Sequence, residues 1–252
     1  MYIKNYNSTH TNSTHTKNGG GNMAKERRTK TKYEIIQVAS KFFLEQSYTN
    51  TSVHTIAKEL GISPGNLTYH FPTKEHLLLG VTEKMVDFKE RKYQKEAGLG
   101  IESISSICLD FMTVVSGCQE SPRAKDLFIA IYSSEMCRNH FQKRRIERAK
   151  RILSEQCAGW TENQFKFVEL MITGIYLSTI TTSDDYLPLE TRLPEALYLI
   201  LDIYGVDEAT RRNEIAKILQ LDYRQIGKNY YKEFIDYVEE INDKILEEMS
   251  DN

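Results

Sequence analysis

The chain has 252 residues, of which 40% are hydrophobic and 27% charged, and its formal net charge is −2 at pH 7. This length suits a small domain plus a larger one, with enough apolar side chains for a core. The longest uncharged stretch, residues 170–183, is too short and too rich in Ser and Thr to span a bilayer, and the N-terminus lacks the apolar core of a secretory signal. These observations exclude a membrane or secreted protein, and we expect a soluble chain in the cytoplasm.

The first 22 residues form a low-complexity segment. Residues 7–11 repeat identically as residues 12–16, and three glycines follow. Such a segment cannot bury apolar surface, so we expect residues 1–22 to be a disordered tail, with Met23 as an alternative start. Residues 25–32 are strongly basic, and two interpretations stay open for them: the solvated start of a helix, or an arm near the DNA backbone or minor groove.

A helix is predicted over about residues 30–46, where apolar residues recur at helical spacing. They are Ile35, Ile36, Ala39, Phe42 and Phe43. Residues 51–78 then read TSVHTIAKELGISPGNLTYHFPTKEHLL. Val53, Ile56 and Leu60 share one apolar face, and Gly61 follows where a helix needs a left-handed residue to stop.

The next helix is very short, at about residues 64–71. Ser63 is a natural N-cap, and Pro64 occupies the first helical position, where a missing N–H costs nothing. Leu67 and Phe71 point inward, which leaves a small polar surface outward. Two short helices joined at a glycine, with the second helix presenting such a surface, are typical of a helix-turn-helix that enters the DNA major groove.

This segment resembles the tetracycline-repressor family of bacterial transcription regulators. The residues that carry the resemblance are Ile35, Ile36, Ala39, Phe42, Phe43, Thr51, Ser52, Val53, Ile56, Ala57, Gly61, Ile62, Ser63, Gly65, Leu67, Tyr69, His70, Phe71, Lys74 and Glu75. The match covers about 50 residues. Asn66 and Thr68 depart from the commonest family pattern, so no base preference is carried over, and Pro72 removes one phosphate contact.

The resemblance implies an all-α fold, in which a three-helix DNA-binding head with a helix-turn-helix precedes a larger helical ligand-binding and dimerisation domain. We place the head at residues 23–76 and the larger domain at residues 77–252. The head segment carries eight Lys and Arg against five Asp and Glu, so the excess of acid lies in the larger domain. A basic head on an acidic body is the charge distribution expected of a DNA-binding protein.

The larger domain is predicted to consist of helices only. Thr73 caps a long helix to about residue 93, and a capping box at residues 161–164 begins another. Pro188 and Pro194 are assigned to a loop. The remaining predicted helices span about residues 101–118, 122–138, 139–157, 161–182, 195–204, 207–221 and 224–249.

Ten residues are candidates for DNA contact. By the resemblance, Asn66 and Thr68 would meet base edges, and Pro64 and Gly65 would allow close approach. Asn pairs with adenine and Thr touches a thymine methyl group. Phosphates would be held by Thr51, Ser52, Tyr69, His70 and Lys74, and His54 would reach the backbone or a base.

The cysteines, a basic run and six aromatic residues each have an ordinary structural explanation beside a functional one. The four cysteines, Cys108, Cys118, Cys137 and Cys157, are scattered and expected to be reduced; Cys137 and His140 alone are a poor metal site. Residues 143–151, KRRIERAKR, keep an apolar stripe, so we take their charges as a solvated face rather than an anion patch. Six aromatic residues are either core or the lining of a ligand pocket: Phe128, Tyr132, Phe141, Trp160, Phe165 and Tyr176.

We therefore expect a ligand-responsive repressor that binds a palindromic double-stranded DNA operator as a homodimer, and we expect residues 161–182 and 195–221 to form the dimer. A small-molecule inducer would release the repressor from the operator. Binding to the operator would place the protein at the nucleoid. An alternative is a DNA-bound interaction protein that recruits a protein partner through its helical body. No catalytic signature, cofactor motif or metal motif is evident, so an enzyme is not expected.

Overall fold

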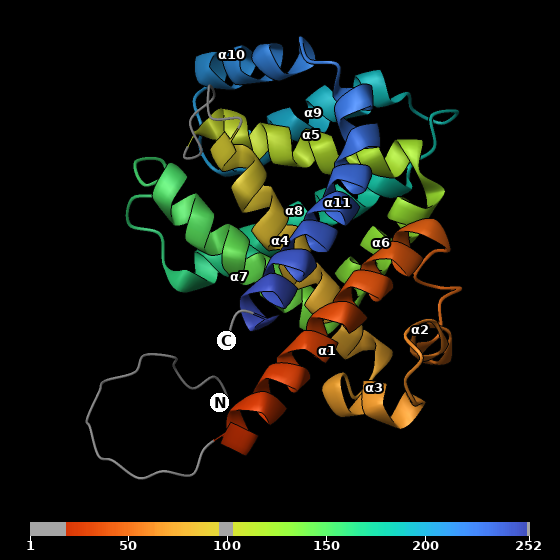
Figure 1. Ribbon diagram of the computed structural model, residues 1–252. Helices are drawn as coiled ribbons and strands as arrows, with labels where there is room; N and C mark the ends of the chain where they lie inside the picture. Colours follow the sequence, from red (N-terminus) through yellow and green to blue (C-terminus); the bar gives the residue numbers. More distant parts are fainter. Residues whose placement is uncertain (1–18, 96–102, 251–252) are drawn as a thin grey trace, which may run out of the picture.

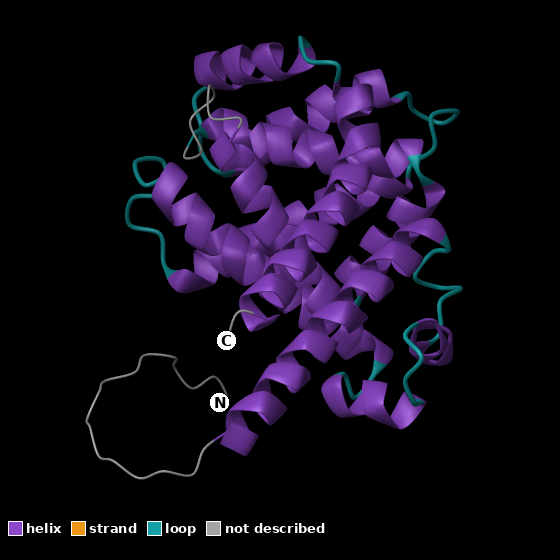
Figure 2. Cartoon of the chain, in the orientation of Figure 1, coloured by secondary structure: helices purple, strands orange, loops and turns teal. Residues whose placement is uncertain are grey.

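The computed structural model describes residues 19–95 and 103–250, and this part of the chain forms eleven α-helices and no strand (Figure 1; Figure 2). The all-α prediction is therefore confirmed. Among the described helices, none combines the length and apolar character needed to cross a membrane. In chain order the helices are α1 Gly19–Glu45, α2 Val53–Glu59, α3 Pro64–His70, α4 Lys74–Lys95, α5 Ile104–Glu120, α6 Pro122–Ser133, α7 Glu135–Ile152, α8 Glu162–Thr181, α9 Leu189–Ile203, α10 Glu208–Leu219 and α11 Tyr223–Ser250.

The head consists of α1, α2, α3 and the first turn of α4. Its core is made by the fully buried Ile35 and Phe43 of α1, Ile56 of α2, Leu67 of α3 and Leu77 of α4. These are the apolar positions of the sequence pattern, so helix spacing alone brought them to one side of each helix. The boundary expected after residue 76 falls in the first turn of α4, so one continuous helix carries the chain out of the head.

The turn between α2 and α3 follows from local residues. Gly61 has a φ of +64°, which glycine adopts without the strain that a Cβ brings. The N–H of Ile62 donates to the carbonyl of Ala57 at 3.0 Å, and the N–H of Gly61 donates to the carbonyl of Lys58 at 3.1 Å. This pair of bonds satisfies the last carbonyls of α2 and fixes the angle at which α3 leaves.

In the body, which comprises the rest of α4 and α5 to α11, α5 packs against α6, α8, α9, α10 and α11. The long α11 crosses α5 where two glycines meet. A Cβ on Gly227 would lie 2.4 Å from the backbone nitrogen of Gly117, so the two backbones are in direct contact. Phe111 and Met112 of α5 are buried, and the Phe111 ring packs against that of Tyr176 in α8, with ring centres 4.7 Å apart.

The head and body share a continuous core. In Figure 1, α11 runs alongside α1, and the Asn242 side-chain amide donates to the side-chain carbonyl of Gln37 at 2.5 Å. The aromatic ring of Phe88 in α4 packs against those of Tyr230 and Phe234 in α11, with ring centres 5.3 and 5.8 Å apart. The head is therefore attached to the body by α11 as well as by α4.

Three expectations need correction. Helix α1 begins at Gly19, inside the segment expected to be a tail. Residues 25–32 are part of α1, in agreement with the first of the two open interpretations, the start of a helix. Once the Ile35 region forms a helix, adding preceding residues costs little, because nucleation is the expensive step. Residues 1–18 lie outside the described part.

The other two corrections concern helix boundaries in the body. The break between α6 and α7 lies at Ser134, four residues before the expected position, because the Ser134 side chain caps α7 by accepting the N–H of Cys137. Pro194 lies inside α9 rather than in a loop. It removes one backbone hydrogen bond, to the carbonyl of Glu190, which is an exposed residue.

Candidate nucleic-acid interface

Helix α3 presents a polar face that is held in place from both ends. At its start, the Ser63 side chain accepts the N–H of Asn66 at 3.1 Å, and Pro64 occupies the first helical position. At its end, Phe71 is buried and its N–H donates to the carbonyl of Leu67. With Leu67 and Phe71 buried in the head core, the opposite side of the helix faces solvent.

Seven of the ten predicted contact residues are exposed on this surface or next to it. They are Ser52, His54, Pro64, Gly65, Asn66, Thr68 and Tyr69. The Tyr69 side chain is 63% exposed, which is unusual for so large an apolar group and leaves its ring available to a partner. The Thr68 hydroxyl donates to the carbonyl of Gly65 at 3.2 Å. This hydrogen bond fixes the rotamer of the Thr68 side chain and therefore the direction of its methyl group.

Helix α2 supplies the second edge of the interface. The Ser52 hydroxyl oxygen accepts the N–H of Thr55 at 3.0 Å, which caps the helix while leaving Ser52 exposed. His54 and Lys58 are exposed on α2. Lys58 was not among the predicted contacts, although its exposure and charge are compatible with a phosphate.

A basic flank formed by Arg28 and Lys32 of α1 borders α3. The Arg28 guanidinium lies 4.9 Å from the centre of the Tyr69 ring, and the Lys32 ammonium lies 5.9 Å from the centre of the Phe71 ring. His70, which is half-buried, lines an open groove of about 600 Å³ together with residues of α1 and with Glu83 and Lys84 of α4. Partial burial, with the charges of Arg28 and Lys32, lowers the pKa of His70, so its neutral form is favoured in the absence of an anion.

Thr51 does not fit its predicted role. It is only 2% exposed, and its hydroxyl donates to the carbonyl of Ser47 at 2.7 Å. A buried hydroxyl with a backbone acceptor closes the turn before α2 and is not available to a phosphate. Its neighbour Ser52, one residue later, is the exposed one.

Lys74 is also engaged within the protein. Its ammonium donates to the carbonyl of Tyr48 at 2.5 Å and lies 4.1 Å from the centre of the Tyr48 ring. Burial lowers the pKa of Lys74, against the opposing effect of the Asp126 carboxylate. The prediction assigned this charge to a phosphate, whereas the structure uses it to hold the turn between α1 and α2.

The same turn is bound to the body. The Asp126 carboxylate of α6 accepts the N–H of Thr49 at 2.8 Å and the Thr49 hydroxyl at 2.5 Å. A second contact joins the start of α4 to the start of α7, since the Ser134 hydroxyl donates to the Glu75 carboxylate at 2.5 Å. Nothing in the sequence near Asp126 indicated this joint, because the partners are 77 positions apart.

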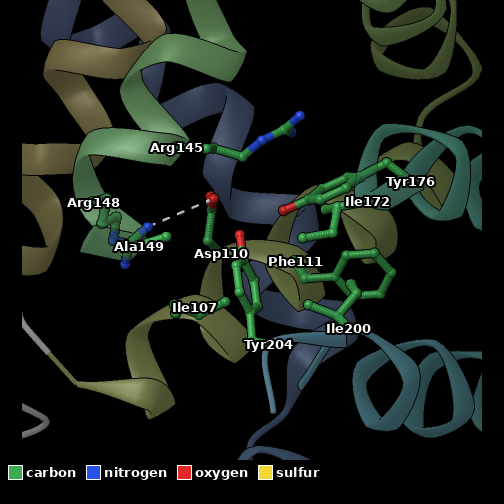
Figure 3. A pocket seen from close by; sticks show the side chains of 10 residues that line it. All are labelled: Ile107, Asp110, Phe111, Arg145, Arg148, Ala149, Ile172, Tyr176, Ile200 and Tyr204. Carbon is green, nitrogen blue, oxygen red and sulfur yellow. Dashed lines mark ion pairs between the residues drawn. The ribbon is translucent and has the colours of Figure 1, made fainter. Parts of the chain in front are cut away.

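The body contains a partly open, mainly apolar cavity of about 30 Å³ between α5, α7, α8 and the end of α9 (Figure 3). Of the six aromatic residues considered as pocket lining, Tyr176 alone is among the residues that line it. Phe128, Tyr132, Phe141 and Phe165 are buried core residues, and Trp160 is partly buried against the core.

The basic run at residues 143–151 is only partly a solvated face. Arg145 points inward, where its Nε donates to the Glu169 carboxylate at 2.5 Å, and Arg148 lies 3.7 Å from the Asp110 carboxylate. The interpretation as a purely solvated face was therefore wrong for these two arginines. The acids that draw them inward lie on α5 and α8, far away in the sequence.

The remaining chemical groups of the body do not form an obvious reactive centre. In the described part of the chain, no three His, Cys, Asp or Glu residues converge as metal ligands would. All four cysteines are free and buried, and burial raises the pKa of Cys118 to about 12. A thiol in such surroundings is a poor nucleophile.

Comparison with known proteins points to one family for the head. Residues 35–81 match the family model described as bacterial regulatory proteins, tetR family. The HTH-type transcriptional regulator YuxN of Bacillus subtilis is 45% identical over 53 residues, which are 21% of this chain and 18% of that protein. The HTH-type transcriptional regulator QacR of Staphylococcus aureus is 37% identical over 65 residues, which are 26% of this chain and 32% of that protein.

The similarity to these relatives covers less than a third of this chain. Two crystal structures of a gamma-butyrolactone receptor, an ArpA-like protein, align with 82% of the chain and with 99% and 100% of their own lengths. Their sequence identities are 17% and 16%, and the TM-scores are 0.42 and 0.43. Residues 35–81 of this chain therefore match the helix-turn-helix head of the tetracycline-repressor family of bacterial regulatory proteins.

Proposed function

We propose that the protein is a ligand-responsive transcriptional repressor that binds a palindromic operator as a homodimer through residues 23–76, at the nucleoid. The exposed polar face of α3 carries this proposal. That face is short, rigidly capped and bordered by the basic flank, so α3 can enter a major groove while Arg28 and Lys32 lie near phosphates.

In this proposal the exposed residues divide into two groups. Asn66 and Thr68 read base edges, with Pro64 and Gly65 permitting close approach. Ser52, His54, Tyr69 and His70 contact the DNA backbone, and Thr51 and Lys74 support the turn behind them.

Asn66→Ala is expected to relax discrimination at one base pair of each half-site. The Asn66 side chain is exposed and its backbone N–H is capped by Ser63, so removing the amide leaves the helix intact. A lost bidentate contact reduces discrimination by about 1–3 kcal/mol. Affinity for a panel of operator variants measures the effect, with Asn139→Ala, exposed on α7, as the matched control. Equal weakening on every variant would refute a role in reading bases.

Lys32→Ala is expected to weaken binding on all sequences and to make the slope of log affinity against log salt shallower by about one unit. Lys74→Ala should leave that slope unchanged, because its ammonium already donates to the carbonyl of Tyr48. Salt titrations of both variants on one DNA duplex test the assignment. If the slope became shallower for Lys74→Ala and not for Lys32→Ala, the assignment would be reversed, and Lys74 would be the phosphate contact.

The dimer is proposed to form through α8 and α9. The large apolar side chains Phe167, Leu170 and Met171 of α8 and Leu199 of α9 are 40–62% exposed. Gly174 lies on the same exposed side of α8, and a Cβ at this position would meet no atom within 4 Å, so another helix could approach closely. Burying such a surface against a second copy would remove it from water.

Other large apolar side chains of α8 pack into the core of the protomer. Phe165, Val168, Ile172 and Tyr176 are buried within the protomer, and Ile175 is partly buried. The proposed dimer surface is thus on the opposite side of α8.

Regulation is proposed to pass from the body cavity to the head through α6 and α4. A ligand that binds one arrangement of the body more tightly would shift the head through the Asp126 joint, and so change the separation of the two α3 helices. Residues 77–252 would then be the ligand-binding and dimerisation domain.

Selecting DNA fragments from a random pool with the purified full chain tests the proposal as a whole. The expected product is an inverted repeat whose half-sites are centred about one helical turn, or a multiple of it, apart. Enrichment of no sequence, with binding that depends on salt alone, would contradict an operator-specific regulator.

A further inference from the structure

The end of α3 lies alongside the N-terminal half of α1, where two cations face residues 69–71 (Figure 1). Arg28 and Lys32 are one helical turn apart on α1, so they project from the same side of it. The Arg28 guanidinium lies over the Tyr69 ring, and the Lys32 ammonium lies over the ring of Phe71. His70 stands between these two aromatic residues, and its ring centre is 5.4 Å from that of Tyr69. The two cations therefore flank the imidazole.

The open groove that His70 lines is bordered by further charged groups of α1 and α4. Its titratable lining residues, besides His70, are Arg28, Lys32 and Tyr33 of α1 and Glu83 and Lys84 of α4. The Lys84 ammonium is paired with the Asp87 carboxylate at 3.1 Å. Arg28 and Lys32 are exposed and form no ion pair with any residue that the structure describes. The charges of these two side chains are therefore available to an anion that enters the groove.

His70 is the group of this groove whose charge depends most on such an anion. It is half-buried, and its ring makes no hydrogen bond within residues 19–95 and 103–250. Burial, followed by the charges of Arg28 and Lys32, lowers the pKa of His70, so the imidazole of the free head loses its proton at a lower pH than an ordinary histidine. An anion beside the ring would attract the imidazolium and offset the repulsion from the two cations.

A phosphate of the DNA backbone is the anion that this position favours. The groove opens next to the exposed polar face of α3, and His70 lies one helical turn after Asn66 on that helix. When α3 enters a major groove, the end of the helix is close to the sugar-phosphate backbone that borders it. Exposed Arg and Lys side chains beside that end are the usual partners of phosphates.

Building on the DNA-binding function proposed above, we propose that this groove holds one backbone phosphate of the DNA, and that His70 takes up a proton as the phosphate enters. Each head then binds DNA together with one proton, which is released when the DNA leaves. The imidazolium adds a third positive group beside the phosphate, with Arg28 and Lys32. The DNA interface therefore responds to pH, and its affinity for DNA rises as the pH falls.

The direction of this effect follows from the two states of His70. The pKa of His70 is lowered in the free head and is raised again by the phosphate in the complex. Between these two pKa values the complex holds more protons than the separated molecules do. The association constant is therefore largest below the pKa of the free head, and it falls as the pH rises toward the pKa of the complex, by at most about tenfold per pH unit for each head.

Titrating the full chain with a double-stranded DNA of arbitrary sequence, at constant ionic strength, tests the proposal. Binding is expected to be at least about fivefold tighter at about pH 6 than at about pH 8. Calorimetry at an intermediate pH, in two buffers that differ in their enthalpy of ionisation, should show a net uptake of protons. Equal affinity at the two pH values, no proton uptake, or no binding at the lower pH would overturn the proposal.

Three variants assign the proton to His70. His70→Gln keeps a neutral donor and should reduce the ratio of the two affinities to less than about twofold. His70→Arg carries a permanent charge, so it should bind more tightly than His70→Gln at both pH values, without a pH dependence. His54→Gln, at an exposed histidine of α2, should keep the full ratio. A pH dependence that persists in His70→Gln, or that is lost in His54→Gln alone, would overturn the assignment.

Circular dichroism checks that each His70 variant is folded, and if one of them is not, the other decides. NMR of the imidazole groups then separates DNA from small phosphate compounds. The His70 signal, identified by its absence from a His70 variant, should titrate at a higher pH with the DNA than without it. An equimolar amount of inorganic phosphate should leave that signal unchanged. An equal effect of inorganic phosphate would overturn the assignment to the DNA backbone.

The outcome is separable from that of the proposed function. Because the DNA used has an arbitrary sequence, proton uptake at His70 supports the phosphate site even if selection from a random pool yields no operator. Selection of an inverted repeat, with binding that does not depend on His70 or on pH, would support the regulator and overturn this inference.

Discussion

Leu170→Glu is expected to give a folded monomer that loses specific operator binding by about 1,000-fold or more, since specific binding exceeds non-specific binding by at least about that factor. Leu170 is 52% exposed in the single chain, so a charge there is solvated and the protomer keeps its fold. In the proposed dimer the same charge would be buried against α8 or α9 of the second copy without a partner. A lone head would then retain only the salt-dependent attraction to phosphates.

Sedimentation, circular dichroism and operator titration measure association, folding and binding in the same samples. Lys228→Glu, at an exposed position of α11, makes a larger change in charge away from the proposed surface and should leave all three unchanged. A folded Leu170→Glu monomer that still binds the full palindrome tightly would eliminate the dimer proposal. A Leu170→Glu dimer would move the interface away from α8.

Gly227→Ala is expected to destabilise the protein by about 3 kcal/mol, at the upper end of the typical cost of overpacking. The new methyl carbon would lie 2.4 Å from the Gly117 nitrogen and 2.7 Å from the Ser116 carbonyl carbon. These are backbone atoms of α5, which cannot move away as a flexible side chain would. Helices α5 and α11 would have to separate, and the buried contacts of Tyr231 would be lost with them.

Thermal unfolding measures the effect, and the expected decrease in Tm is roughly 6–12 °C for a chain of this size. Lys228→Ala is the control, because Lys228 directly follows Gly227 in α11 and its side chain is exposed. An unchanged Tm for Gly227→Ala would mean that the two helices are further apart than the structure places them.

The parts of the fold that the sequence predicted best are those built from local interactions. The helix-turn-helix was located to within about one residue, with helices observed at Val53–Glu59 and Pro64–His70. Ser52, Ser63 and Gly61 act on backbone groups within a few positions of themselves, so their effects can be recognised in a single sequence. The apolar faces of α1 and α4 were predicted equally well from the spacing of their apolar residues.

Charged residues were predicted less well. From the neighbouring sequence, Lys74 was expected to contact a phosphate and Arg148 to face solvent. In the structure, Lys74 binds the carbonyl of Tyr48, 26 positions away, and Arg148 lies near Asp110, 38 positions away. Pairs so far apart are brought together only by the packing of whole helices. Spacing within one helix carries no information about which acid or carbonyl lies opposite.

By itself, then, the sequence determined that the head is a capped helix-turn-helix with a polar second helix, because caps, glycine turns and apolar periodicity act over a few residues. Only the tertiary structure decided which of the candidate contacts are exposed, which side of α8 is available to a second copy, and that arginines of α7 surround a cavity. Those properties depend on the relative positions of distant helices, and the close crossing of α5 and α11 at Gly117 and Gly227 is one of the contacts that sets them.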